Sequence, residues 1–153
     1  MFTDYQCPTC ASVYPILKKL VDGYGKNVRL VIRDFPLEQI HENAFQAALA
    51  ANAANAQGKF FEYKEKLYKN QKSLDTESLK KYAVEIGLKV KQFERDLENK
   101  RFVGEVRKDI ADGKKYGVDG TPSIFVNGYK IRSLSVISFR KAIERALKNR
   151  KQL

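Results

Sequence analysis

The only two cysteines of the 153-residue sequence, Cys7 and Cys10, stand three residues apart with Pro8 and Thr9 between them. A bridge within such a pair closes almost no loop, so it cannot stabilise a fold as structural disulfides do. Where a C-x-x-C motif opens a helix, the free backbone N–H groups and the helix dipole favour a thiolate, and the pKa of the first cysteine falls below its usual value of about 8.5. Pro8 suits the first helical turn because it needs no N–H partner there. The motif predicts a redox pair in which Cys7 attacks and Cys10, one turn further in, resolves the mixed disulfide.

A C-x-x-C pair can instead form half of a zinc site. The chain has no second cysteine pair and a single histidine, His41, so a closed site within one chain would need unusual ligands. Two chains could still share a metal through four sulfurs. A non-catalytic binding module with a zinc-holding C-x-x-C therefore remains the alternative to redox chemistry, which itself needs no metal or other cofactor. We expect His41 to pack or hydrogen-bond locally.

A second candidate site is the step from Thr121 to Pro122, which follows Gly117 and Gly120. Only about 5–6% of such bonds are cis in folded proteins, so these residues alone leave the isomer open. A proline at the first residue of an inner strand costs no ladder hydrogen bond. If the bond is cis, Pro122 would lie beside Cys7 and the backbone of Thr121 would be open to an extended substrate.

The elements that must position these residues follow from the spacing of apolar side chains. Asn127-Gly128 between two apolar runs indicates a β-hairpin with a type I′ turn. Asp75 is expected to cap a helix with Leu74 and Leu79 as a hydrophobic staple. In chain order the prediction is a strand over residues 1–5, a helix from Cys7 to about Val21, a buried strand over Val28–Ile32, helices over 40–57, 60–68, 75–87, 90–97 and 102–110, the hairpin over 123–132, and a helix from Val136 to Leu147.

This order predicts an α/β protein with a thioredoxin-like fold. Its core is discontinuous and comprises residues 1–37 and 117–149. A helical domain over residues 38–116 is inserted between the second core strand and the Pro122 segment, and residues 150–153 form a tail. Two independent domains are not expected from a chain of this length.

The chain carries 29 basic and 18 acidic side chains, a formal charge of +11. Such an excess would suit an anionic partner such as nucleic acid. However, the lysines are spread from Lys18 to Lys148 without a basic run or an aromatic–basic motif, so we interpret the charge as solvated surface and expect no nucleic-acid partner. No apolar run approaches the roughly 18 residues that a membrane span needs, and the first residues lack the features of a secretory signal.

Several stretches of the sequence resemble the DsbA-like thiol-disulfide oxidoreductases, specifically their compact thioredoxin-4 subgroup. The resemblance implies the thioredoxin fold, a cis Pro122, and a role for Thr121 and Pro122 as substrate contacts. It also implies an extracytoplasmic protein, in a bacterial periplasm or cell envelope, whose signal or anchor is absent from this chain. The stretches that carry it are Phe2–Cys10, Phe35-Pro36-Leu37, His41, Ala44, Ala47-Ala48, Gln57–Glu62 and Gly117–Gly128.

The resemblance implies exchange of disulfides with cysteine-containing protein substrates, and a redox partner that reoxidises or reduces the pair. We expect an oxidase of secreted proteins, with a reductase or isomerase of the same fold as the alternative. Two positions depart from the family pattern. Thr9 replaces the histidine found in many relatives, which leaves the redox potential open, and Met1 stands where relatives often carry a buried acid. Without that acid, proton transfer at Cys10 would depend on water or on another group.

Overall fold

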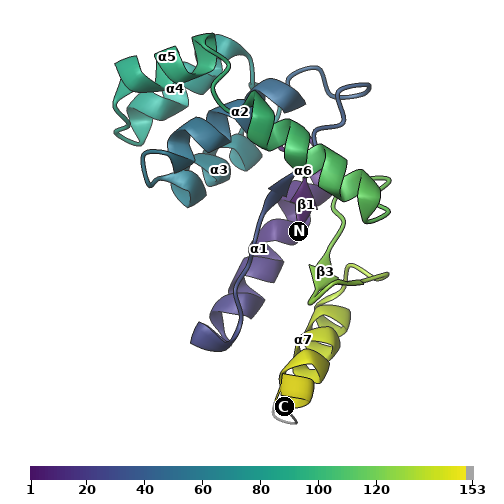
Figure 1. The fold of residues 1–153 in the computed structure, drawn as a ribbon. Helices are drawn as coiled ribbons and strands as arrows, with labels where there is room; N and C mark the ends of the chain where they lie inside the picture. The colour runs from purple at the N-terminus through teal and green to yellow at the C-terminus, as the bar shows by residue number, and fades with distance from the viewer. Residues whose placement is uncertain (151–153) are drawn as a thin grey trace.

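The computed structural model describes residues 1–150, which fold into seven α-helices, one 3-10 turn and four short strands (Figure 1). Of the predicted tail, Arg150 is the last residue of α7, and residues 151–153 lie outside the described part of the chain. The elements are β1 (Phe2–Thr3), α1 (Pro8–Asp22), η1 (Gly25–Asn27), β2 (Arg33–Asp34), α2 (Ala44–Asn55), α3 (Phe60–Lys69), α4 (Thr76–Glu85), α5 (Val90–Glu98), α6 (Val103–Lys115), β3 (Phe125–Val126), β4 (Tyr129–Lys130) and α7 (Val136–Arg150).

The strands meet around β1. β1 pairs with β2 in parallel, with Phe2 opposite Arg33 and Thr3 opposite Asp34. On its other side, Phe2 forms an antiparallel bridge with Ser123, just before β3. β3 and β4 form the predicted hairpin, in which Asn127 and Gly128 both have positive φ angles, of 47° and 87°. The bridge at Phe2 therefore brings the residues that follow Pro122 next to the strand that leads to Cys7.

The second core strand lies later in the sequence than predicted. The structure assigns no strand to Val28–Ile32, and β2 covers Arg33 and Asp34. Val31 is 46% exposed, so this run is also not the buried strand that its composition indicated. The backbone hydrogen bonds to β1 and its flanks run from the Val31 carbonyl to the Phe35 amide, which centres the pairing on Arg33 and Asp34.

Helices α2 to α5 gather at one end of the molecule, and α1 and α7 extend from the other end (Figure 1). Eight of the twelve residues of α2 are buried, seven of them alanines, which lets the neighbouring helices approach it closely. Asp75 caps α4 by accepting the Ser78 backbone N–H, and the staple residues Leu74 and Leu79 are both buried, as predicted. Within the described chain, no helix is both long and apolar enough to cross a bilayer.

The first helix of this block begins later than predicted, at Ala44 instead of Ile40. Ile40 is 72% exposed and lies in a turn whose backbone N–H groups, at Ile40 and His41, both bond to the Leu37 carbonyl. The Leu37 N–H and the His41 ring are in turn bound by the carboxylate of Asp4. This anchoring holds residues 37–41 against the loop before Cys7, so a regular helix starts only after it.

Helix α6 closes the sheet on the side of Phe2 and Phe35. The Arg33 guanidinium forms ion pairs with Asp109 and Asp112 of this helix. Gly113 allows the close approach, because a Cβ atom there would lie 2.7 Å from the Phe35 ring and 3.1 Å from the Phe2 ring. α6 thereby fixes the position of β1 and β2 under the cysteine loop.

Candidate functional site

Cys7 and Cys10 lie at the start of α1, where the predicted motif places them. Cys7 is the N-cap residue with extended backbone angles, φ −72° and ψ 117°, and Pro8 occupies the first turn. Pro8 and Thr9 are exposed, whereas Cys7 is 7% exposed and Cys10 is fully buried. Both cysteines are free thiols. Of the two sulfurs, only that of Cys7 is open to an incoming molecule.

The surroundings of Cys7 favour its thiolate. A hydrogen bond from the Cys10 thiol is the largest influence, and the backbone N–H groups of Cys10 and Thr9 and the side chain of Thr121 add to it. Burial opposes ionisation, but these interactions outweigh it and lower the pKa of Cys7 to about 5. At neutral pH the sulfur is therefore ionised and nucleophilic.

Cys10 has the opposite environment. Its thiol donates to Cys7, and together with complete burial this raises the pKa of Cys10 far above its usual value. Weaker interactions with the Asp4 backbone and the Thr3 side chain act in the other direction. The pair thus contains one ionised, accessible sulfur and one protonated, buried sulfur, which is the division of roles that exchange through a mixed disulfide requires.

The segment of Thr121 and Pro122 lies directly beside Cys7. The Cys7 sulfur is 3.4 Å from the Thr121 carbonyl oxygen, and the Thr121–Pro122 peptide bond is cis. A groove along the Thr121–Pro122 segment is lined by Thr9, Thr121, Pro122, Arg132 and Leu134, among others. All six residues singled out in the sequence are thereby brought together.

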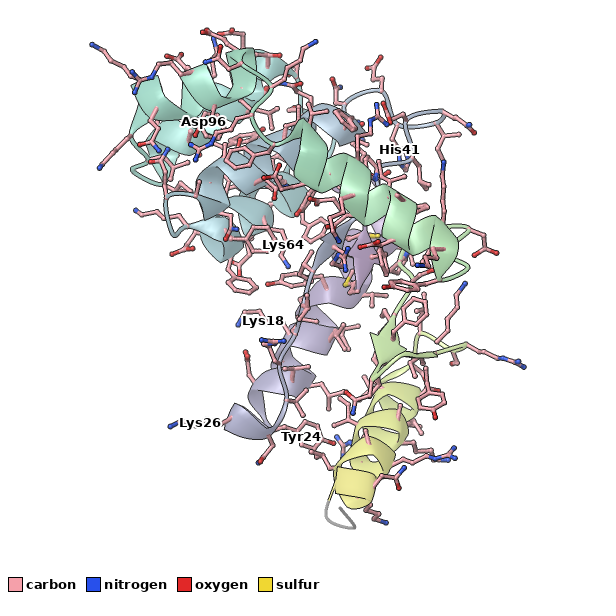
Figure 2. The ribbon with its side chains drawn as sticks, in the orientation of Figure 1. Lys18, Tyr24, Lys26, His41, Lys64 and Asp96 are labelled. Atoms are coloured by element: carbon pink, nitrogen blue, oxygen red, sulfur yellow. The ribbon has the colours of Figure 1, made fainter. Side chains whose placement is uncertain are left out.

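The sequence analysis missed Asp4, which organises the loop before Cys7. Its fully buried carboxylate accepts the Gln6 and Leu37 backbone N–H groups, each at 2.8 Å, and also bonds to His41 Nδ1 at 2.8 Å. His41 therefore forms a hydrogen bond, but to a partner 37 residues away instead of a local one; its position on the turn before α2 is visible in Figure 2. An acidic residue three positions before the C-x-x-C motif was the available signal.

Gln71, after α3, is the second residue that was missed. Its side-chain amide donates to the carbonyl of Tyr5 at 2.8 Å and to that of Cys7 at 2.9 Å. These bonds tie the backbone on both sides of Gln6 to the helical insertion. No local pattern in the sequence indicates this contact, because it joins residues 64 and 66 positions apart.

Metal binding was the main alternative for the cysteines. Over residues 1–150, no group of three or more His, Cys, Asp or Glu side chains is placed to hold a metal ion. Cys7 instead interacts with Cys10 and Thr121, and Cys10 interacts with Cys7 and Thr3.

The chain matches the family described as Thioredoxin over residues 1–145. A thioredoxin-like oxidoreductase from Silicibacter pomeroyi DSS-3 is 32% identical and aligns over 96% of this chain and 84% of that one, with a TM-score of 0.84. The chain belongs to the thioredoxin family. BdbD from Bacillus subtilis, in its oxidised form, is 25% identical, with a TM-score of 0.81 over 96% of this chain and 85% of that one. The resemblance inferred from the sequence is confirmed, and so is the thioredoxin-like fold of this DsbA-like protein with its helical insertion.

A different kind of relative is found among longer proteins. The Na(+)/H(+) antiporter NhaA 1 of Mycobacterium sp. (strain KMS) is 36% identical over 129 residues, which are 83% of this chain and 21% of the antiporter. The DsbA-like chain thus spans about a fifth of the length of that relative.

Proposed function

We propose that the protein exchanges disulfides with cysteine-containing proteins through Cys7 and Cys10. The observation that carries this proposal is the contrast between the two sulfurs: Cys7 is ionised at a helix start with a pKa of about 5, and Cys10 is protonated and fully buried behind it. When the pair is oxidised, a substrate thiolate attacks Cys7 and forms a mixed disulfide, and Cys10 leaves as the thiolate and takes up a proton. The second substrate thiolate then attacks the substrate sulfur of the mixed disulfide, and Cys7 leaves as a stable thiolate.

The low pKa of Cys7 favours the oxidase direction. An ionised Cys7 stabilises the reduced pair, and a pair with a stabilised reduced form is a strong oxidant. We therefore propose a DsbA-like oxidase of secreted proteins that acts in an extracytoplasmic compartment. A redox partner reoxidises its cysteine pair after each cycle. Reductase or isomerase activity is the alternative within the same chemistry.

Substrate contact is proposed for Thr121 and Pro122, and support of the cysteine loop for Pro8 and Thr9. A peptide that is disulfide-bonded to Cys7 must pass the Thr121 carbonyl, which lies 3.4 Å from the sulfur. An extended backbone can pair with exposed backbone groups in such a position. Thr9 and Pro122 line the groove into which that peptide would continue.

Alkylation tests the proposal directly. The reduced protein is treated with iodoacetamide between pH 4 and pH 9, and the modified cysteine is identified by mass spectrometry. Labelling at Cys7 is expected to reach half its maximal rate near pH 5 and then to level off, because the thiolate is the reacting species. Cys7→Ser should remove the fast phase and Cys10→Ser should retain a reactive Cys7. Slow, equal labelling of both cysteines with a midpoint above pH 8 contradicts the proposal.

Equilibration with glutathione distinguishes the directions. A potential near that of the strongest oxidases, about −120 mV, supports the oxidase, and one near about −270 mV supports a reductase. Zinc analysis of protein purified without added metal tests the non-catalytic alternative. Stoichiometric zinc together with no exchange of disulfides would favour the zinc-holding binding module.

A further inference from the structure

The excess positive charge of the chain is concentrated in one region. The helical insertion, residues 38–116, carries 16 basic and 13 acidic side chains, so its charges nearly cancel. Residues 18–31 and 136–149 are far fewer, yet they carry eight basic and only two acidic side chains. We call these two segments the basic end. Although lysines occur along the whole sequence, the net charge thus belongs largely to this part of the molecule.

The two segments of the basic end lie side by side. The first comprises the end of α1, η1 and the chain that follows, and the second belongs to α7. α1 and α7 share one apolar cluster, and Arg29 and Leu147 line the same groove. Figure 1 shows both helices extending away from the insertion, and Figure 2 shows Lys26 at the far end of α1. The cations of the two segments therefore border one surface.

Most cations of the basic end have no acidic partner. Lys18 pairs with Asp22 at 2.8 Å. Every other basic side chain of the two segments is exposed and forms no ion pair within the described chain. In the insertion, by contrast, five cations pair with acidic side chains, namely Lys66, Lys80, Arg101, Arg107 and Lys108. The charge of the basic end is thus left for a partner to neutralise.

The ends of the two helices explain only part of this charge. α1 and α7 both end in this region, and cations are favoured in the last turn of a helix. Arg140 and Lys141, however, lie in the first half of α7, and Lys26 and Arg29 lie outside both helices. The favourable effect of a helix end does not reach these four positions.

Exposed apolar side chains stand among these cations. Ile137 is 67% exposed and precedes Arg140 and Lys141 by about one helical turn. Val31 is 46% exposed and follows Arg29 by two residues. A bilayer surface matches this combination, because its head groups neutralise cations and the acyl boundary accepts apolar side chains. Nucleic acid is instead bound by side chains that hydrogen-bond to phosphates and bases or stack on them.

We propose that the basic end docks on the surface of a bilayer that contains anionic lipids. The choice of a bilayer over nucleic acid also rests on the proposed extracytoplasmic function. α1 runs from Pro8 to Asp22, which corresponds to about 22 Å at 1.5 Å per residue. With the end of α1 at the bilayer, Cys7 lies at the opposite end of the helix. The docked protein therefore keeps its reactive sulfur open to protein substrates.

Sedimentation with sucrose-loaded vesicles tests the proposal. Vesicles of phosphatidylglycerol and phosphatidylcholine in equal parts are compared with vesicles of phosphatidylcholine alone. The protein should bind only the anionic vesicles and should be released as the salt rises from about 0.1 M to about 1 M, where the Debye length falls from about 10 Å to about 3 Å. The double variant Arg145→Glu/Lys148→Glu should bind at least about twentyfold more weakly, since each cation near an anionic surface contributes about fivefold.

A matched variant separates the basic end from net charge alone. Lys81→Glu/Lys91→Glu changes the charge by the same amount at exposed positions of α4 and α5 and should leave binding within about threefold of the wild type. Lys26→Glu/Arg29→Glu alters the other segment of the basic end and should weaken binding as the α7 variant does. It also keeps the test decisive if the α7 variant fails to fold.

The outcomes distinguish this inference from the proposed exchange chemistry, because vesicle binding needs no disulfide exchange. Equal weakening in the variants of the basic end and in the α4–α5 variant overturns the proposal, as does equal binding to both kinds of vesicle. Tighter binding to duplex DNA than to the anionic vesicles, lost in the same variants, would assign the surface to nucleic acid and overturn it too. Alkylation of Cys7 that slows tenfold on the vesicles overturns the proposed orientation.

Discussion

The interior of the helical insertion and the interior around the cysteines are built differently. The core of the insertion consists mainly of buried apolar side chains, including Phe93, Leu67 and a row of alanines from α2, and its buried charged residues are Lys64 and Asp96. Around β1 and β2, the buried residues include Thr3, Asp4, Asp34 and Ser123. Each of these polar side chains has a hydrogen-bond partner, and three of the four bond to residues more than 15 positions away.

This difference indicates that the two regions have different roles, one in stability and one in positioning the cysteine loop. Apolar packing needs only complementary shape, so the insertion can serve as a stable support. Buried polar groups cost free energy unless they are hydrogen-bonded, and here they are hydrogen-bonded around the strand and the loop that lead to Cys7, which they hold in place. The contacts that the insertion makes through His41, Gln71 and Tyr68 converge on residues 3–7. Other contacts, through Asn52, Asp109 and Asp112, hold β2. The insertion thus holds the loop before Cys7 in place, and the two cysteines themselves lie outside the insertion.

A cavity in the insertion is the strongest way to test this division. Phe93 is fully buried, and its ring centre lies 5.4 Å from that of Tyr63. Phe93→Ala is expected to lower the free energy of unfolding by about 3–5 kcal/mol, because it leaves a cavity in an apolar core. The folded variant should retain the wild-type alkylation rate of Cys7. Val84→Ala, at a position that is 59% exposed, is the control. A tenfold slower Cys7 in folded Phe93→Ala would contradict the separation of the two regions.

Lys64, at the boundary, sharpens the comparison through pH. Its side chain reaches from α3 toward α1 (Figure 2), where its Nζ lies 3.3 Å from the centre of the Tyr14 ring. It has no hydrogen-bond partner among the described residues, and burial lowers its pKa to about 7. The unfolded chain keeps this proton up to a pH of about 10.4, so wild-type stability should rise with pH between the two values.

Lys64→Met should therefore be more stable than the wild type at pH 6, by about 2 kcal/mol, since a buried charge is replaced by an apolar side chain. The advantage should shrink as the pH rises from about 7 to 10. Urea unfolding at several pH values measures it, with the exposed Lys69→Met as the control. A variant that is less stable at every pH would show instead that the surrounding rings hold the ammonium favourably.

The smallest expected effect compares two glycines of α6. Gly113→Ala should cost about 1–2 kcal/mol, because the new methyl group would meet the rings of Phe35 and Phe2. Gly104→Ala on the same helix has open space around it and should gain up to about 0.5 kcal/mol from helix propensity. Thermal unfolding of both variants gives the difference. Equal stability would mean that α6 can shift away from β1 and β2 without cost.

The sequence by itself determined the features whose geometry is set by neighbouring residues. The start of α1 at Cys7 and Pro8, the Asp75 cap and the Asn127-Gly128 turn were all predicted, because a helix end or a tight turn depends on a few consecutive backbone angles and side chains. The family signature at Cys7–Cys10 and at Thr121–Pro122 then indicated which ends must meet.

The tertiary structure alone decided which distant groups meet. The position of β2 follows from the residues that pair with β1, Arg33 and Asp34, and not from the apolar run of Val28–Ile32. The bonds of Asp4 to His41, of Gln71 to the Cys7 carbonyl and of Thr3 to Tyr68 join residues 37 to 65 positions apart. Such pairs form only when packing brings their elements together, so no spacing within the chain could have revealed them.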